Sequence, residues 1–196
     1  MITVIQKNYI SPPINQKEIL RYLGVGVLDD ETKKLVNECI VQFCDNAVYK
    51  VCYALLPVTV LDDTCDFGVF TFKSRDLAKN LNGTTKAIVF AATVGIGVDR
   101  LINKYSRISP AKAMVFDAIG SERIETLCDQ FCSDIKVDFG DFKPRFSAGY
   151  GDLPIEVQKE IFSLLQCNKN IGLTLNDSYM MSPSKSVSAF VGIING

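Results

Sequence analysis

The chain of 196 residues contains no histidine. Without an imidazole it cannot form a Ser–His or Cys–His nucleophile pair, and it cannot build a zinc site that includes histidine. It also lacks the side chain that proteins use most often as a general base near neutral pH. Enzyme classes that depend on any of these groups are therefore excluded.

The sequence also lacks an excess of either charge. Lys+Arg number 21 and Asp+Glu number 22, so no overall field attracts nucleic acid or an anionic membrane. No uninterrupted apolar run approaches the roughly 20 residues that span a bilayer. The first seven residues have no basic region followed by an apolar one, so we expect no secretory signal. We therefore expect a cytoplasmic protein that binds neither nucleic acid nor membranes.

The seven cysteines are irregularly spaced, and with no export signal we expect reduced thiols rather than a disulfide framework. Cys128 and Cys132 are four residues apart and would share one face of a helix. A pair at this spacing could bind metal or oxidise, but no further Cys or His lies nearby in the sequence. Burial as small apolar side chains is the favoured interpretation.

Hydrophobic residues make up 47 % of the chain, enough for a real core in one domain, residues 1–196. The alternation of strand and helix patterns predicts an α+β fold with one mixed or largely antiparallel sheet and helices packed against it. Strands are predicted at 1–10, 48–61, 67–72, 87–93, 171–175 and 187–194, and helices at 16–23, 30–45, 75–82, 98–105, 110–135 and 153–165.

Several helix ends are marked by their residues. Asn15 and Ser74 are predicted caps, and Gly24 is a predicted stop. Asp152 is predicted to cap the helix whose first turn contains Pro154. On the long helix, an apolar side of Met114, Val115, Ala118, Leu127 and Phe131 is predicted. The acidic segment 62–66 lacks the glycine and the distant glutamate of a calcium loop, so we expect a solvated turn between two strands.

A glycine-rich turn, Val94-Gly95-Ile96-Gly97-Val98, joins the predicted central strand to a helix. This arrangement suggests dinucleotide binding, but Arg100 replaces the third glycine of that motif, and no acidic residue ends a following strand. Close packing of the turn is the favoured explanation.

The segment 145–152 gathers polar, glycine and aromatic residues without an evident packing reason. Arg145 is a permanent cation suited to a carboxylate or phosphate, and Gly149 would let a ligand lie against the backbone. Tyr150 offers a flat ring with a hydroxyl. These residues suit a small, flat ligand with a carboxylate. The alternative is a surface turn in which Arg145 is solvated and Tyr150 covers the core.

Arg-x-x-x-Gly-Tyr at 145–150, followed by Ser178, Pro183 and Ser-Val-Ser at 186–188, resembles the C-terminal activation domain of cobalamin-dependent methionine synthase. The resemblance is best over residues 86–196. Residues 1–85 resemble mainly stand-alone relatives, through the string 18–24. The resemblance to this activation domain implies a C-shaped α+β domain that binds S-adenosylmethionine in a surface groove.

The resemblance also implies roles for five residues. Arg145 would pair with the ligand's carboxylate, the backbone at Ser147 and Gly149 would hydrogen-bond the ligand, and Tyr150 would pack against it. Glu125 would answer the ligand's ammonium or sulfonium charge. The alternative for Glu125 is a solvated helix residue, flanked by acidic residues at helical spacing. None of these residues would act as an acid or base, so catalysis would be the positioning of two reactants.

By resemblance, the chain is a stand-alone reactivation subunit that presents S-adenosylmethionine to the cob(I)alamin of a methionine synthase or another corrinoid protein. A flavodoxin-like donor would supply the electron. Since the chain has no histidine, a partner must carry and ligate the cobalamin. An S-adenosylmethionine-binding or corrinoid-docking module without turnover, and a scaffold that has lost the ligand, are the alternatives. A ligand-binding aspartate and a second tyrosine of the family have no counterpart in this sequence.

Overall fold

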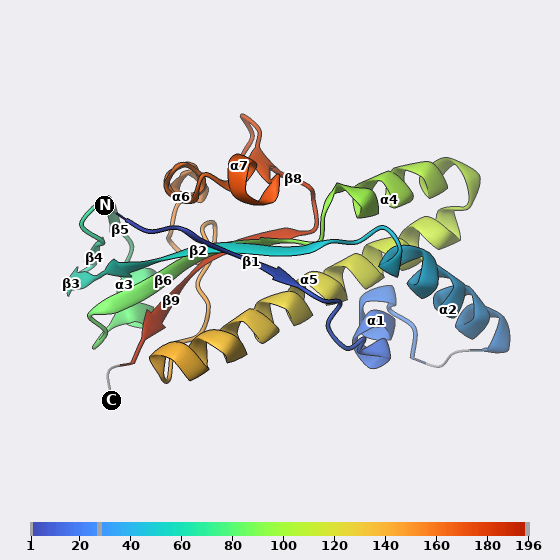
Figure 1. The fold of residues 1–196 in the computed structure, drawn as a ribbon, viewed down its shortest axis with the longest axis horizontal. Helices are drawn as coiled ribbons and strands as arrows, with labels where there is room; N and C mark the ends of the chain where they lie inside the picture. The colour runs from blue at the N-terminus through green and yellow to red at the C-terminus, as the bar shows by residue number, and fades with distance from the viewer. Residues whose placement is uncertain (1, 27–28, 195–196) are drawn as a thin grey trace.

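The computed structural model describes residues 2–26 and 29–194 of the protein (Figure 1). Its centre is a four-stranded sheet in the order β1 (Ile5–Tyr9), β2 (Tyr49–Pro57), β6 (Lys86–Thr93) and β9 (Ser186–Ile193). Every neighbouring pair in this sheet is antiparallel. The predicted α+β fold with a largely antiparallel sheet is confirmed.

Side chains of the central strand β6 alternate between two cores. Ile88 and Phe90 belong to the core on one face, and Val89 and Ala91 to the core on the other. This is the period of two that a strand imposes on its side chains. Since both faces are covered, β6 is apolar at nearly every position, as the sequence predicted for a buried central strand.

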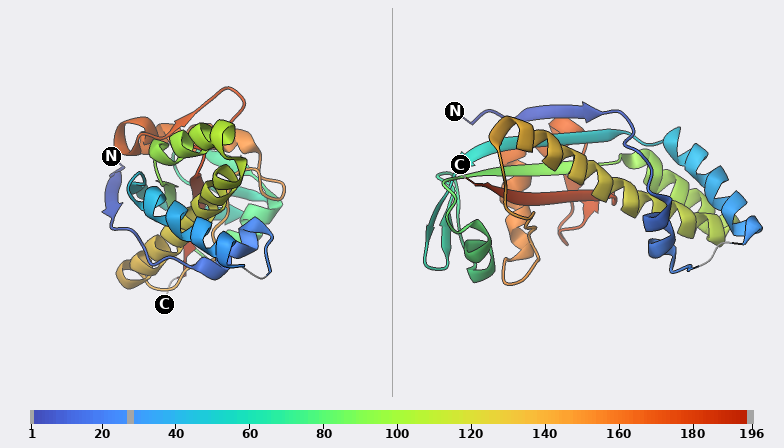
Figure 2. Two further views of the ribbon diagram at one scale, coloured as in Figure 1. Left: turned by 90° about the vertical axis from the view of Figure 1, so that its right-hand side faces the viewer. Right: turned by 90° about the horizontal axis from the view of Figure 1, so that it is seen from below.

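Helices α1 (Gln16–Leu23), α2 (Asp30–Cys44), α4 (Ile96–Ile108) and α5 (Pro110–Phe139) form the first of these cores with one face of the sheet. Figures 1 and 2 show that α2, α4 and the first half of α5 extend beyond the end of the sheet, which makes the molecule elongated. The second half of α5 runs across the sheet. It therefore lies against β9 and the segment beside it.

The second face carries shorter elements. They are α3 (Arg75–Leu81), the 3₁₀ turn η1 (Ile155–Val157), α6 (Gln158–Leu165), α7 (Cys167–Ile171), a small sheet of β3 (Thr59–Leu61), β4 (Thr64–Asp66) and β5 (Thr71–Lys73), and a hairpin of β7 (Thr174–Leu175) and β8 (Met181–Ser182). Figure 1 shows α6 and α7 on the side of the sheet opposite α5.

Local capping was predicted well. The side chains of Asn15 and Ser74, the two predicted caps, each accept a backbone N–H in the first turn of the helix that follows, and Asp29 does the same for α2. Gly24 ends α1 in the left-handed conformation, with φ of 69°.

The prediction for residues 48–72 was wrong in detail. Strand β2 ends at Pro57, and a separate strand, β3, begins at Thr59. The acidic segment 62–66 contains strand β4 instead of a simple turn. Its Cys65 is buried, because β4 packs on the second core. Pro57 lies at the end of β2, beyond the residues that pair with β1, so its missing N–H faces no neighbour there.

Three further predictions were wrong. The long helix continues to Phe139, and Met114 is exposed, because its side chain points away from the core. Residues 171–175 do not join the main sheet but end α7 and begin the β7–β8 hairpin. Asp152 does not cap the helical segment that follows it. That segment begins with the 3₁₀ turn η1 after Pro154, and no side chain caps it.

The glycine-rich turn has a packing explanation. A Cβ at Gly95 would collide with Val48, and one at Gly97 would collide with the carbonyl oxygen of Asn46. The strand before the turn has only antiparallel neighbours, so it is not part of the parallel βαβ unit that dinucleotide binding requires. Both observations support packing as the reason for the glycines.

Candidate functional site

A row of polar side chains runs along the outer face of α5. Asp117, Ser121, Glu125 and Asp129 follow one another at intervals of four residues, so they lie above each other on one ridge of the helix. With the usual rise of about 1.5 Å per helical residue, the row is about 18 Å long from Asp117 to Asp129.

Arg145 reaches this row from a segment that lies along β9. Phe142 pairs with Ile193 and Phe146 with Phe190, which holds 142–146 in an extended conformation at the edge of the sheet. Consecutive side chains of such a segment point to opposite faces. Because Phe146 packs in the core beneath α6, Arg145 points to the face that carries α5.

One guanidinium nitrogen of Arg145 is shared by two carboxylates. Its Nη2 lies 3.0 Å from Glu125 Oε2 and 3.1 Å from Asp129 Oδ1. The other terminal nitrogen, Nη1, is buried and has no hydrogen-bond partner among the described residues. Buried donors of a charged group are almost always paired, so this nitrogen calls for an acceptor that the described residues do not supply, whether water or ligand.

A cavity of about 550 Å³ opens beside this arginine. It is lined by Asp129, Cys132, Ser133, Phe142, Pro144 and Arg145. The volume is within the range of small-molecule sites, which is roughly 300–1,000 Å³. The cavity therefore combines a cation, a carboxylate and apolar surface.

The two thiols under Arg145 are buried and unreactive. Burial raises the pKa of Cys132 to about 11 and also raises the pKa of Cys128. Each thiol is thus neutral at physiological pH and offers Arg145 only a weak sulfur contact. Burial alone would lower the pKa of Arg145, but Cys128, Asp129 and Glu125 raise it above its ordinary value. The arginine stays charged.

The loop after Arg145 is closed by its own backbone. The Gly149 amide donates to the Leu153 carbonyl over 2.9 Å, and the Tyr150 amide donates to the Ser147 carbonyl over 3.2 Å. Gly149 has φ of +82°, and a Cβ there would lie 2.8 Å from Ile155 Cδ1. The space beside this glycine is therefore taken by Ile155, and the Gly149 amide is already bonded.

Tyr150 is 72 % exposed, and its ring meets that of Phe146 edge-on at 5.8 Å between centroids. Tyr150 thus packs against the core residue Phe146 with most of its ring exposed, and Arg145 is ion-paired instead of being fully solvated. The structure brings Glu125 and Arg145 together. Among the described residues, no hydrogen bond, ion pair or ring contact joins Tyr150 to that pair.

Lys185 is a cation of the same row that the sequence did not single out. Its Nζ lies 2.8 Å from Asp117 Oδ1 and 2.9 Å from Ser121 Oγ, and its stem packs where Gly120 has no side chain. The spacing of four residues from Asp117 to Asp129 is the signal that could have revealed the row. The loops 145–152 and 176–186 were expected to meet. Instead Arg145 and Lys185, one from each loop, contact successive turns of α5, and no hydrogen bond or ion pair joins the described residues of the two loops.

Asp152 serves a neighbouring helix. Its carboxylate accepts from Ser74 Oγ (2.5 Å), from the Arg75 amide (2.9 Å) and from the Asp76 amide (3.1 Å), so it caps α3 from 76 or more residues away. These bonds, that of Ser74 first, lower the pKa of Asp152 below its usual range. The carboxylate anchors the far side of the candidate loop.

Comparisons with known proteins agree on one family. Residues 135–194 match the family model described as vitamin B12 dependent methionine synthase, activation domain. The expected resemblance is confirmed. The matched segment includes Arg145, Ser147, Gly149 and Tyr150, whereas Glu125 lies before it. No curated protein matches the chain.

The activation-domain fold extends over nearly the whole chain. A crystal structure of the MetH reactivation domain bound to AdoHcy matches with a TM-score of 0.72 and 14 % sequence identity. The match covers 98 % of this chain and 78 % of that one. The N-terminal third, which was expected to resemble mainly stand-alone relatives, therefore shares the fold as well.

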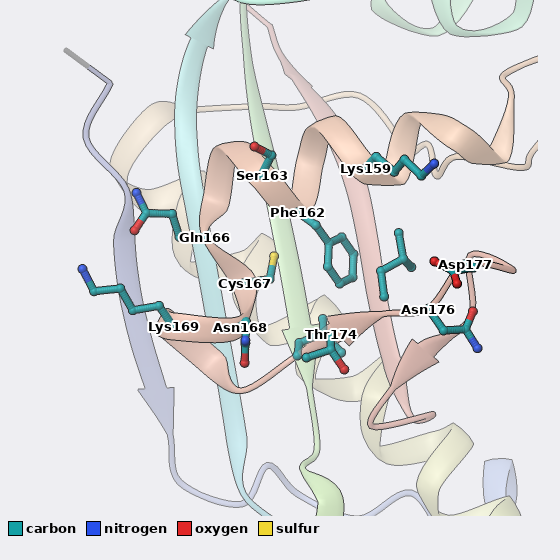
Figure 3. Close-up of a pocket in the computed structure, with 12 residues that line it drawn as sticks. Lys159, Phe162, Ser163, Gln166, Cys167, Asn168, Lys169, Thr174, Asn176 and Asp177 are labelled. Atoms are coloured by element: carbon teal, nitrogen blue, oxygen red, sulfur yellow. The ribbon is translucent and has the colours of Figure 1, made fainter.

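A larger cavity, about 700 Å³, lies elsewhere, between α6, α7 and β7 (Figure 3). It is lined by Lys159, Phe162, Ser163, Gln166, Cys167, Asn168, Lys169, Leu173, Thr174, Leu175, Asn176 and Asp177. Several of its polar groups are already engaged: Lys159 lies 4.9 Å from the Tyr179 ring, and Asn176 Oδ1 accepts two backbone amides. It contains none of the residues predicted for the site, so size alone does not make it the better candidate.

Residues 2–26 and 29–194 offer neither a cluster of metal ligands nor a membrane-spanning helix. No group of three or more His, Cys, Asp or Glu is placed there to hold a metal ion. Over the same ranges, no helix combines the length and the apolar character needed to cross a bilayer.

Proposed function

We propose that the protein is a reactivation subunit that binds S-adenosylmethionine and presents it to the cob(I)alamin of a methionine synthase or another corrinoid protein, for reductive re-methylation. The stand-alone action, the corrinoid partner and a flavodoxin-like electron donor are parts of this proposal. It is supported by the family match over residues 135–194 and by the shared fold.

The observation that carries the proposal is the buried Nη1 of Arg145, which has no partner among the described residues. A ligand carboxylate is the acceptor whose charge and geometry best suit a guanidinium. The Glu125 carboxylate lies 3.0 Å from the same guanidinium. It would pair with the ammonium group of the ligand, which is bonded to the carbon next to the ligand's carboxylate. The residues present therefore fit the amino-acid end of S-adenosylmethionine.

Other residues would then complete the binding. The hydrogen bonds within the described loop leave the Ser147 amide and the Gly149 carbonyl for a ligand. Tyr150 presents an exposed ring, which suits packing against a ligand or against a docked partner. Phe142 and Pro144 give the cavity an apolar wall.

The chemistry asked of this chain is limited to placement. A cob(I) nucleophile and a sulfonium methyl group react without a protein acid or base, so the protein's contribution is to hold the methyl donor in one orientation. This agrees with a chain that contains no histidine. Arg145 and Glu125 would fix one end of the donor, and the open side of the cavity would face the partner.

A module that binds S-adenosylmethionine or docks a corrinoid protein without turnover is the second candidate. The exposure of Tyr150 favours docking, because a large aromatic ring on a loop is typical of protein interfaces. This candidate predicts binding of the ligand or the partner without methyl transfer.

The test is calorimetric titration of the protein with S-adenosylmethionine, alone and with a cobalamin-loaded methionine synthase module. We expect saturable binding that Arg145→Ala weakens by about ten- to a hundredfold, since a hydrogen bond to a charged group contributes roughly 1.5–3 kcal/mol. Arg107→Ala, at an exposed position of α4, is the matched control and should not alter the affinity.

The partner arm separates the two candidates. Methylation of the partner's cobalamin after reduction, lost in Arg145→Ala and retained in Arg107→Ala, supports reactivation. Binding without methylation supports the binding module. Absence of heat under both conditions would refute the S-adenosylmethionine site.

A further inference from the structure

The ion-paired cluster at the cavity carries more negative than positive charge. Arg145 contributes one positive charge, and Glu125 and Asp129 contribute one negative charge each. Asp129 is the only carboxylate besides Glu125 that ion-pairs with Arg145 among the described residues. The cluster therefore has a net charge of minus one before any ligand binds.

Asp129 is the more exposed of the two carboxylates that pair with Arg145. Its side chain is 73 % exposed, against 48 % for Glu125, and it lines the cavity together with Arg145. It follows Glu125 by one helical turn on the same ridge, about 6 Å farther along the axis. A ligand in the cavity would thus contact Arg145 and Asp129, with Glu125 bound to the same arginine one turn away.

Resting on the function proposed above, we propose that Asp129 makes this cavity selective for the sulfonium form of its ligand, S-adenosylmethionine, over the thioether, S-adenosylhomocysteine. S-adenosylmethionine carries one carboxylate, one ammonium and one sulfonium, hence a net charge of plus one. The ligand's carboxylate is opposite in charge to Arg145, and its ammonium and sulfonium groups are opposite in charge to Glu125 and Asp129. The thioether lacks the sulfonium and leaves one carboxylate of the cluster without a positive partner.

This selectivity would favour release of the product after each methyl transfer. Donation of the methyl group converts the sulfonium into the neutral thioether, so the product loses an attraction that the substrate had. The product then leaves more readily than the substrate, which keeps the cavity available. The effect should be about fivefold in affinity, since unit charges about 4 Å apart in water attract by an energy of that size.

The experiment measures the dissociation constants of S-adenosylmethionine and S-adenosylhomocysteine for the full chain, at low salt. We expect the wild-type protein to prefer the sulfonium ligand, and Asp129→Asn to lose about fivefold of that preference. Asp129→Glu keeps the charge and should keep most of the preference. Asp138→Asn removes the same charge from an exposed position of α5 farther along the helix and should leave the ratio unchanged.

Raising the salt concentration should reduce the wild-type preference toward that of Asp129→Asn, because an exposed charge is screened within about 10 Å at 0.1 M salt. A ratio that is the same in wild type, Asp129→Asn and Asp138→Asn would overturn the role of Asp129 while leaving the ligand site in place. If the wild-type protein binds neither ligand, the proposed function itself fails, and this inference fails with it.

Discussion

Two carboxylates of helix α5 pair with arginines, and the two pairs differ in almost every physical respect. Arg123 and Glu122 are buried, with 0 % and 1 % of their side chains exposed, and their closest atoms are 2.5 Å apart. Glu125 lies one turn farther along α5, and its partner Arg145 comes from the segment beside β9; their side chains are 48 % and 25 % exposed and lie 3.0 Å apart. The comparison separates a charge pair that builds the fold from one that is open to a ligand.

The buried pair is fully bonded. Arg123 donates to Glu122 and to the carbonyls of Pro12 and Pro13, over 2.5 and 2.7 Å for the two carbonyls. Glu122 Oε1 accepts from the amide of Asn15 at 3.0 Å and from Thr126 Oγ1 at 2.9 Å. These bonds attach the connection between β1 and α1 to the long helix.

In the exposed pair of Arg145 and Glu125, one donor of the arginine has no partner among the described residues. Arg145 shares one nitrogen between two exposed carboxylates, while its buried Nη1 has no partner among the described residues. A complete set of hydrogen bonds rigidifies a buried network, and an incomplete set at a cavity is where a ligand gains most. The same residue types therefore serve structure at one turn of α5 and, in the proposed function, recognition at the next.

The largest expected effect is the loss of Arg123. Arg123→Met leaves Glu122 buried without its cation, which should lower the free energy of unfolding by about 3–5 kcal/mol. Urea denaturation followed by circular dichroism measures the change. The double variant Glu122→Leu/Arg123→Met removes both charges and should recover much of the loss. A cost below about 1 kcal/mol for Arg123→Met would show that the buried pair is not structural.

A smaller loss of stability is expected at Ser74, beneath the candidate loop. Its hydroxyl accepts the Leu77 amide and donates to Asp152, and Ser74→Ala should cost about 1–2 kcal/mol, as is usual for a helix cap. Denaturation gives the stability, and titration with S-adenosylmethionine should give an unchanged affinity. A large loss of affinity would mean that the anchor of the loop belongs to the site.

The pH dependence of stability should contain a contribution from Asp152. Its pKa is lowered in the folded state, chiefly by the Ser74 hydroxyl, so the stabilisation is present above the unfolded pKa and is lost as the pH falls through the lower folded value. Asp152→Asn should therefore make the stability less dependent on pH below about pH 4. Denaturation curves between pH 2.5 and 6 test this, with Asp138→Asn as the control.

The smallest effect on stability should come from the open pair. Glu125→Gln removes one partner of a partly exposed ion pair and should cost less than about 1 kcal/mol, because solvent screens the charges. The difference should disappear at 1 M salt. A cost as large as that of Arg123→Met would place Glu125 among the structural residues and contradict the distinction between the two pairs.

The sequence was informative wherever a bond is local. Asn15 and Ser74 cap helices through residues three positions away, and the apolar run of β6 requires burial on both faces. The family resemblance singled out Glu125 and Arg145 as ligand contacts, but their ion pair across twenty positions was not predicted.

Long-range partners could not be derived from the sequence. Glu122 has the appearance of a solvated helix residue beside Glu125, and its burial depends on carbonyls that the chain brings in from about 110 residues away. Asp152 precedes a helix as caps usually do, yet it bonds to α3. No local pattern distinguishes a cap for the adjacent helix from one for a distant helix.

In the proposed function, Arg145 is held ready for a ligand, whereas Arg123 is held by the fold. The most direct test is the denaturation midpoint of the wild type and of Arg145→Met, each with and without S-adenosylmethionine at a hundred times its wild-type dissociation constant. The wild type should gain about 2.7 kcal/mol from the ligand. Arg145→Met should be about as stable as the wild type without ligand and should gain only about 0.4–1.4 kcal/mol with it, because its affinity is ten- to a hundredfold weaker. An equal gain in both proteins would show that Arg145 does not bind the ligand.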